Sequence, residues 1–203
     1  MARRTPQEAA QTRQALLMAA LEVFSERGAT TATLKDVAAR AGVTHGALYW
    51  HFKNREALLE GVFQQVPLPF DRHYLEQLQA SRQQALAALE AYLLGLLREI
   101  AGDVRIRRAY RLFYTGSDNG DPVATLSGQR QRALAQCVGH IHHFLKQARK
   151  QQLIGLKKSQ LEPMARSICC LLLGVMQAML LDPELFSCKE QGPLLVRSCL
   201  RGL

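Results

Sequence analysis

TTATLKDVAARAGVTHGALYWHFKNREAL, residues 30–58, is the stretch that decides the fold. Thr33, followed three residues later by Asp36, has the spacing of a helix capping box. An apolar stripe follows and ends at Gly42, and Thr44 is suited to cap the next helix. Two short helices joined by a tight glycine turn predict a helix-turn-helix.

Helical spacing of apolar residues continues on both sides of this stretch, and no run of strand-like alternation interrupts it. A first helix should end at Gly28, and a connecting helix should follow the helix-turn-helix until Pro67 interrupts it. We therefore predict an all-α fold that divides into residues 1–66 and residues 67–203. Beyond the division, helices are expected near residues 86–100, 104–114, 134–148, 159–182 and 193–200, with a loop at 115–122 and an S-x-x-E capping box at Ser159.

The composition is that of an ordinary globular chain of 203 residues, 48% hydrophobic and 21% charged. The longest uncharged apolar run, Ile168–Leu181, is shorter than the roughly 18 residues that indicate a membrane span. No apolar segment follows the first arginines, and the five cysteines show no CxxC pairing. We expect a cytoplasmic protein with reduced thiols and no membrane partner.

The net charge of +9 suits a polyanionic partner, but its distribution weakens that argument. Residues 1–66 hold 8 Lys and Arg against 6 Asp and Glu, so most of the excess lies in residues 67–203. A nucleic-acid site must therefore be argued from local residues.

Four of the five residues from Leu48 to Phe52 carry rings, and this bunching needs an explanation. If Leu48 and Phe52 point into a three-helix core, the residues between them lie on the outward side, where a DNA major groove would meet the helix. The alternative is that Tyr49 and Trp50 cover the junction with the next helix.

Residues 30–58 resemble the N-terminal domain of TetR-family transcriptional regulators, especially the AcrR-like branch. The resemblance extends over residues 7–63 and more loosely to RRAYRLFY (107–114) and LLDPELF (180–186). It implies a DNA-binding domain at residues 1–66 and a helical ligand-binding and dimerisation domain at 67–203. The implied function is a regulator, most often a repressor of an efflux or related operon, that a small-molecule effector releases from its operator.

The resemblance also implies which residues contact the double-stranded operator. Hydroxyls at helix caps reach phosphates, ring residues pack along the DNA backbone, a lysine binds phosphate, and a glycine brings the helix close to base edges. His45 departs from the pattern, because AcrR-like members commonly carry an arginine that bonds guanine twice. The expected DNA-binding residues are Thr33, Thr44, His45, Gly46, Tyr49, Trp50, His51 and Lys53.

A single short helix buries little surface in a groove, so such modules usually act as dimers on paired half-sites. Residues 164–181 are apolar around much of the helix, and Leu194, Leu195 and Cys199 add a second stripe. We expect a homodimer formed by the last two helices, as the family resemblance implies. The alternative is that the apolar stretch 164–181 is the buried central helix of a monomer.

The resemblance places a small-molecule effector among the long C-terminal helices. Candidate lining residues put aromatic or amide groups on faces otherwise made of Leu and Ile, although each of them also suits the core. A neutral or anionic effector is expected, because residues 67–203 are net basic. The candidates are Tyr92, Tyr110, Phe113, Phe144 and Gln177.

An arginine cluster, Arg105, Arg107, Arg108 and Arg111, is open to three interpretations. It forms a solvated face with acidic partners, it faces the DNA-binding domain and transmits the effector signal, or it extends the contact with phosphate.

Other chemistry has weaker support. Cys137, His140 and His143 are residue types that bind metals, but positions six residues apart do not share one face of a helix, and no fourth ligand follows at a usual spacing. We therefore expect no metal and no cofactor. No G-x-G-x-x-G, P-loop, H-E-x-x-H or G-x-S-x-G motif occurs, which argues against an enzyme. The competing hypothesis is a helical protein-interaction or enzymatic protein whose helix-turn-helix does not bind DNA.

Overall fold

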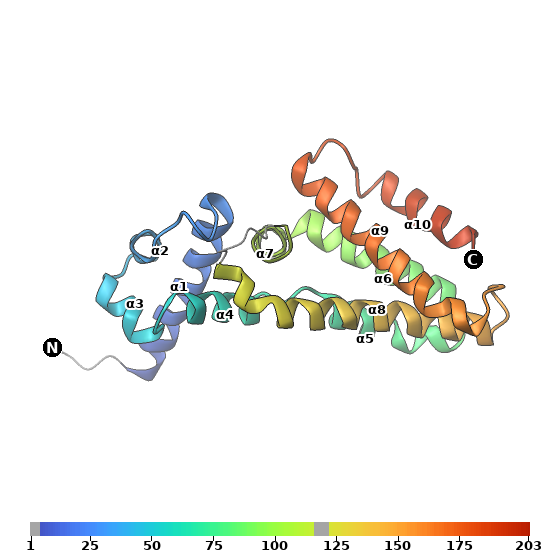
Figure 1. Ribbon diagram of the computed structural model, residues 1–203, viewed down its shortest axis with the longest axis horizontal. Helices are drawn as coiled ribbons and strands as arrows, with labels where there is room; N and C mark the ends of the chain where they lie inside the picture. The colour runs from blue at the N-terminus through green and yellow to red at the C-terminus, as the bar shows by residue number, and fades with distance from the viewer. Residues whose placement is uncertain (1–4, 116–121) are drawn as a thin grey trace. The chain divides into compact units, whose positions relative to one another are not determined.

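The computed structural model describes residues 5–115 and 122–203, and helices dominate both ranges (Figure 1). No strand occurs in these ranges, so the all-α prediction is confirmed. The helices are α1 (Pro6–Arg27), α2 (Leu34–Arg40), α3 (His45–His51), α4 (Arg55–Gln65), α5 (Phe70–Leu78), α6 (Ala85–Gly102), α7 (Val104–Tyr114), α8 (Ser127–Lys150), α9 (Leu161–Leu181) and α10 (Gln191–Arg201), with 3-10 turns at Ala80–Arg82, Pro122–Leu126 and Lys158–Gln160.

The helices form two compact units that differ from the predicted division in one segment. The first unit contains residues 1–68 and 105–130, and the second contains residues 69–104 and 131–203. The predicted division had assigned residues 105–130 to the C-terminal part. They pack with the first unit because their apolar side chains complete its core, namely Ala109, Leu112, Phe113, Val123 and Leu126.

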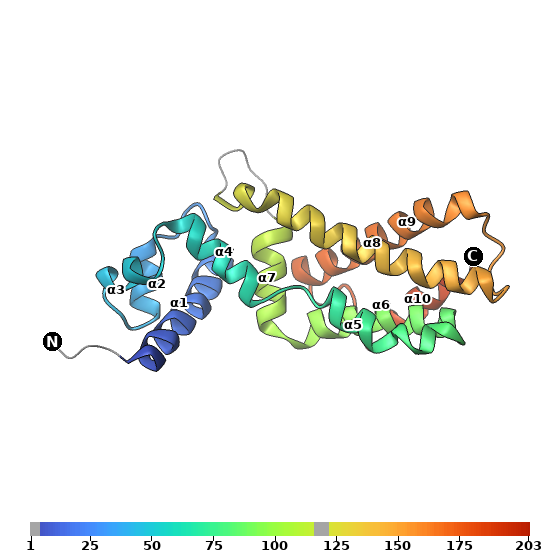
Figure 2. The same ribbon diagram turned by 90° about the horizontal axis from the view of Figure 1, so that it is seen from below.

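In the first unit, local sequence signals set the helix ends. Thr5 and Glu8 form a capping box at the start of α1, and Gly28, with φ 85°, ends it. Asn54 caps α4 by accepting a hydrogen bond from the N–H of Ala57 (2.9 Å). Figure 2 shows α2 and α4 beside α1, against which both helices pack. The core between them is apolar and includes Leu16, Leu17, Phe24, Val37, Leu48 and Leu58.

The second unit is built around α6, which contacts α5, α9 and α10. Its buried residues include Leu89, Tyr92, Leu96 and Ile100. Helix α5 was not predicted, because the predicted helical pattern ends at Pro67 and resumes only near residue 86. Pro69 instead stands at the position before the first turn of α5, where it does not break the helix.

The start of α9 differs from the prediction. Ser159 lies in a 3-10 turn, the helix begins at Leu161, and no side chain caps it. The Gln160 side-chain oxygen accepts a hydrogen bond from the N–H of Lys157 (2.8 Å). The predicted S-x-x-E box is therefore wrong, because a local side-chain bond favours the tighter turn. The predicted loop at 115–122 falls almost wholly on residues 116–121, outside the described part.

By length and composition alone, Lys158–Leu181 is the segment of the described chain that qualifies as a membrane-crossing helix. In the second unit this segment buries one face, which includes Leu161, Ile168 and Leu172. Its other face leaves Leu171 and Leu181 exposed. The helix therefore has two apolar faces, one buried inside the unit and one exposed to solvent.

Candidate nucleic-acid interface

The turn between α2 and α3 has the hydrogen bonds of a Schellman motif. The N–H of Val43 donates to the carbonyl of Ala38 (3.0 Å), and the N–H of Gly42 donates to Ala39 (3.1 Å). Gly42 has φ 67°, a left-handed conformation that favours glycine. The predicted glycine turn is therefore confirmed. The turn fixes the direction in which α3 leaves α2.

The predicted capping box at the start of α2 is present. The Asp36 carboxylate accepts hydrogen bonds from the hydroxyl (2.7 Å) and the backbone N–H (2.8 Å) of Thr33, and the N–H of Asp36 donates to the Thr33 hydroxyl (3.1 Å). These bonds, led by the one from the hydroxyl, lower the pKa of Asp36. The Thr33 hydroxyl hydrogen is thus engaged within the box.

Thr44 is placed differently from Thr33. Its hydroxyl oxygen accepts a hydrogen bond from the N–H of Ala47 (3.2 Å) and so caps α3. Among the described residues no acceptor engages its hydroxyl hydrogen, so Thr44 is the better prepared of the two threonines to donate to an anion.

Helix α3 has one face buried in the core and an opposite, exposed face that carries aromatic rings. Leu48 and Phe52 are buried, as predicted, whereas Tyr49 is 48% exposed and Trp50 is 75% exposed. The alternative that Trp50 covers the junction with α4 is therefore wrong. The outward rings contact one another edge to face, with His45 on Tyr49 (4.9 Å between centroids) and Trp50 on His51 (4.6 Å).

Two further predicted residues lie open to solvent. Lys53 is exposed between α3 and α4. A Cβ placed on Gly46 would meet no atom within 4 Å, so packing inside the chain does not require glycine there. Glycine at this exposed position leaves room for a partner to approach the helix backbone closely.

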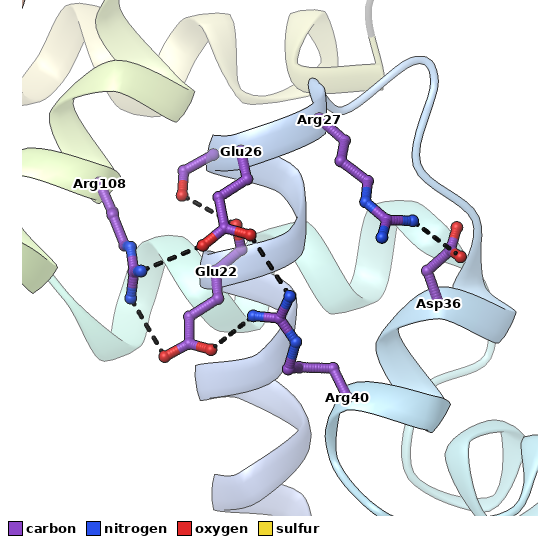
Figure 3. Close-up of polar contacts among 7 residues, drawn as sticks. Glu22, Glu26, Arg27, Asp36, Arg40 and Arg108 are labelled. Carbon is purple, nitrogen blue, oxygen red and sulfur yellow. Dashed lines mark hydrogen bonds and ion pairs between the residues drawn. The ribbon is translucent and has the colours of Figure 1, made fainter.

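Ion pairs hold α2 on α1 at both of its ends (Figure 3). Arg27 of α1 bonds Asp36 at the start of α2 (3.1 Å). At the other end of α2, Arg40 bonds both Glu22 and Glu26 of α1. Sequence analysis missed these contacts, although Glu22 and Glu26 stand one helical turn apart.

The two glutamates, named here the carboxylate pair, also bind Arg108 of α7 (Figure 3). Of the three interpretations of the arginine cluster, this contact supports two for Arg108: it has acidic partners and it faces the DNA-binding helices. The other three arginines of the cluster also have partners in the structure.

The five candidate effector residues are not brought together. In the second unit, Tyr92 and Phe144 are buried with their ring centroids 5.4 Å apart. In the first unit, Phe113 packs edge to face on Phe63, and Tyr110 stacks on Tyr114. Gln177 is half-buried on α9. None of the five lines the hollow of about 390 Å³ between α8 and α9.

Tyr92 belongs instead to a layer of polar contacts inside the second unit. Its hydroxyl lies 3.3 Å from Nδ1 of His140 and 3.6 Å from Sγ of Cys137. Nε2 of His140 lies 3.2 Å from a carboxylate oxygen of Asp71, and the Tyr74 ring stacks on His140 (4.1 Å, 4°). Sequence analysis missed the two α5 residues, because the helix that carries them was not predicted.

Burial governs the ionisation of this polar layer. It raises the pKa of Tyr92 far above its usual value and lowers the pKa of His140, against a smaller opposing effect of Asp71. The pKa of His143 is lowered in the same way, and this ring lies 3.5 Å from the Ser81 hydroxyl. The histidines are therefore neutral around pH 7.

Comparison with known proteins identifies the family. Residues 16–62 match the model of the bacterial regulatory proteins, tetR family. The chain is 36% identical over 118 residues to the uncharacterized HTH-type transcriptional regulator TtgW of Pseudomonas putida, which covers 58% of this chain and 84% of TtgW. The chain belongs to the TetR family. The resemblance inferred from residues 30–58 is thus confirmed.

Two other proteins extend the comparison. The HTH-type transcriptional regulator TtgR, also of Pseudomonas putida, is 32% identical over 137 residues, which is 68% of this chain and 65% of TtgR, just under two thirds of that relative. The structure of the SmeT-Triclosan complex superposes with a TM-score of 0.78 at 28% identity, over 95% of this chain and 91% of SmeT. SmeT is the repressor of the Stenotrophomonas maltophilia multidrug efflux pump SmeDEF.

Proposed function

We propose that this TetR-family chain is a ligand-responsive, DNA-binding repressor of an efflux or related operon, acting in the cytoplasm as a homodimer and not as an enzyme. The observation that carries the proposal is the two-sided helix α3, which anchors Leu48 and Phe52 in the core and exposes Tyr49 and Trp50. The names of TtgW and TtgR as transcriptional regulators, and of SmeT as an efflux-pump repressor, support the same function.

The proposed DNA contacts lie on α3, at the N-caps of α2 and α3, and just after α3. Phosphates accept hydrogen bonds from hydroxyls, phenols and lysine, and such contacts fix register without reading sequence. Gly46 brings the helix near base edges, where His45 supplies one hydrogen bond. The full set is Thr33, Thr44, His45, Gly46, Tyr49, Trp50, His51 and Lys53.

The proposed dimer surface is the open face of α9 and α10. Leu171, Leu181 and Leu194 are exposed there, and a groove lined by Leu171, Leu195 and Cys199 runs between the helices. Covering these side chains removes apolar surface from water, which favours association of two copies. Sedimentation of the full chain at micromolar concentration should give a dimer, and Leu171→Glu should shift it towards monomer; a monomeric unsubstituted chain would contradict this part of the proposal.

The proposed effector site is the interior of the second unit around Tyr92 and Phe144, with the polar layer beside it. Aromatic rings with a few convergent polar groups are typical of small-molecule sites. Tyr110 and Phe113 lie in the first unit, which favours their alternative role in packing, and Gln177 stays a candidate. Neutral histidines and a basic unit suit a neutral or anionic effector, and triclosan, seen with SmeT, is a suitable first probe.

The experiment is an electrophoretic shift with DNA from upstream of the chain's own gene, at several salt concentrations. A regulator should bind this DNA in preference to unrelated DNA and should weaken steeply with salt, because phosphate contacts release counterions. In the proposed homodimer Lys53→Met removes one phosphate contact from each protomer, so it should reduce the salt slope by about 2. Lys150→Met, which removes the same charge from an exposed position in the second unit, is the matched control and should not change the slope.

The outcome also separates the competing classes. Equal affinity for unrelated DNA, or no binding at all, would favour the helical protein-interaction or enzymatic alternative. Retention of full affinity by a Tyr49→Ala, Lys53→Met double variant would refute the proposed contact residues while leaving DNA binding itself intact.

A further inference from the structure

The carboxylate pair is shared between two arginines from different helices, and each arginine bonds both glutamates. Arg40 reaches Glu22 (3.0 Å) and Glu26 (3.3 Å), and Arg108 reaches the same two residues (3.1 Å each). Every carboxylate oxygen of the pair accepts from one of these guanidinium nitrogens. The four side chains thus form a closed ring of two negative and two positive charges (Figure 3).

This arrangement explains why two glutamates stand four residues apart on the same side of α1. Like charges at this spacing on a helix repel one another. A planar guanidinium that bridges both carboxylates offsets the repulsion and also fixes their orientation. The four side chains are 28–42% exposed, so solvent screens their attraction and the ring contributes more to geometry than to energy.

The ring connects α7 to the helix-turn-helix without direct contact between Arg108 and Arg40. Arg40 is the last residue of α2, directly before the turn that leads to α3. Arg108 lies in the second turn of α7, four residues after the chain passes from the second unit to the first at Val104. The carboxylate pair is the intermediate that both arginines share.

We propose that Arg108 is a positioning residue for the DNA-binding face: through the carboxylate pair it holds Arg40, and with it the end of α2 from which α3 departs. Without Arg108, the two carboxylates retain a single guanidinium and their repulsion turns them apart. The end of α2 then becomes more mobile, and DNA binding must pay for ordering it. The step from α2 to DNA affinity rests on the proposed function, whereas the step from Arg108 to α2 does not.

The first test uses amide hydrogen exchange of residues 33–41 in the full chain without DNA. Arg108→Met keeps most of the side-chain stem and removes the guanidinium, so it should speed exchange of α2 about threefold, the scale expected for an exposed ion pair. In an Arg40→Met background the same substitution should cause no further acceleration. Equal acceleration in both backgrounds, or none in either, would overturn the proposal.

Two further variants test whether faster exchange reflects the ring itself or a general loss of folding. Arg27→Met breaks the pair with Asp36 at the other end of α2, which shares no atom with the ring, so its effect should add to that of Arg108→Met. Glu26→Gln removes one of the two carboxylates and with it their mutual repulsion, so in this background Arg108→Met should cause little further acceleration. Helix content by circular dichroism should stay unchanged in every variant.

The second test measures DNA affinity. Arg108→Met should weaken binding about threefold to tenfold with an unchanged salt slope, and Arg108→Lys should restore part of the loss. A slope reduced by about 2, one phosphate contact in each protomer, would make Arg108 a phosphate contact and would refute the positioning role. If the unsubstituted chain binds no DNA, the proposed function fails, while the exchange experiment still decides whether Arg108 holds α2.

Discussion

The two units differ in how they place many of their polar side chains. In the first unit Ser25 and Tyr110 are buried beside an apolar core, and the ion pairs and outward rings lie on the surface. In the second unit a tyrosine, two cysteines and a serine are buried, with two histidines partly buried against the tyrosine and the serine. The difference suits the proposed roles: an apolar core gives the proposed DNA-contact surface a constant shape, and a polar interior offers the proposed effector site hydrogen-bonding groups.

The largest effect should come from removing one buried ring in each unit. Phe24→Ala in the first unit and Phe144→Ala in the second should each lower the free energy of unfolding by about 3–5 kcal/mol, because each leaves a cavity. Amide exchange followed by peptide should show the loss confined to the substituted unit. Equal loss of protection in both units would show one cooperative body and would break the comparison.

A smaller effect should come from removing one hydroxyl in each unit. Tyr92→Phe should destabilise the protein by about 1–2 kcal/mol, because the partly buried His140 and the buried Cys137 lose their partner. Tyr49→Phe removes an exposed hydroxyl and should change stability by no more than about 0.5 kcal/mol, while weakening DNA binding. Urea denaturation and electrophoretic shift measure the two quantities, and equal stability losses would contradict the contrast.

The next comparison uses two glycines that have space for a side chain, one in each unit. A Cβ at Gly46 of α3 or Gly139 of α8 would meet no neighbouring atom, so Gly→Ala should stabilise each helix by roughly 0.5–1 kcal/mol. DNA affinity should fall only for Gly46→Ala, because only that backbone is proposed to approach DNA. The role of Gly46 would be refuted by an alanine variant that is both more stable and equally tight in binding.

The smallest effect should be a difference in pH response. Burial holds the pKa of His140 and His143 below 6.5, with Asp71 opposing the shift at His140 and Lys146 adding to it at His143. The unfolded chain therefore takes up protons first, so the second unit should lose stability as pH falls from about 6.5 towards the lowered pKa values. In the first unit the lowered pKa of Asp36 contributes stability above 3.8 that is lost only as pH falls below it.

Exchange protection, corrected for the intrinsic pH dependence of amide exchange, should therefore fall only in the second unit between pH 7 and 5. A His140→Gln, His143→Gln double variant should flatten this response. A parallel fall in both units would show that other groups govern the acid sensitivity.

The contrast also explains how much the sequence could predict. The helix-turn-helix was predictable because its signals are local: Thr33 and Asp36 cap α2, Gly42 makes the turn, and Leu48 and Phe52 repeat at one helical turn. The same local reasoning failed at Ser159, where a competing side-chain bond gave a 3-10 turn.

The effector candidates were harder to predict because their surroundings come from distant parts of the chain. Tyr92, Asp71 and His140 meet from three helices, and nothing in the spacing of any one helix indicates the others. The sharing of Glu22 and Glu26 with Arg108, over eighty residues away, is hidden for the same reason.

The non-contiguous first unit has a consequence for protein engineering. Because residues 105–130 supply Phe113 and Leu126 to its core, a chimera that grafts only residues 1–66 onto a foreign sensor would leave that core open to water. A hybrid regulator should therefore fold when α3 alone is exchanged, or when residues 105–130 are transplanted together with residues 1–68. It should fail when the chain is cut after residue 66.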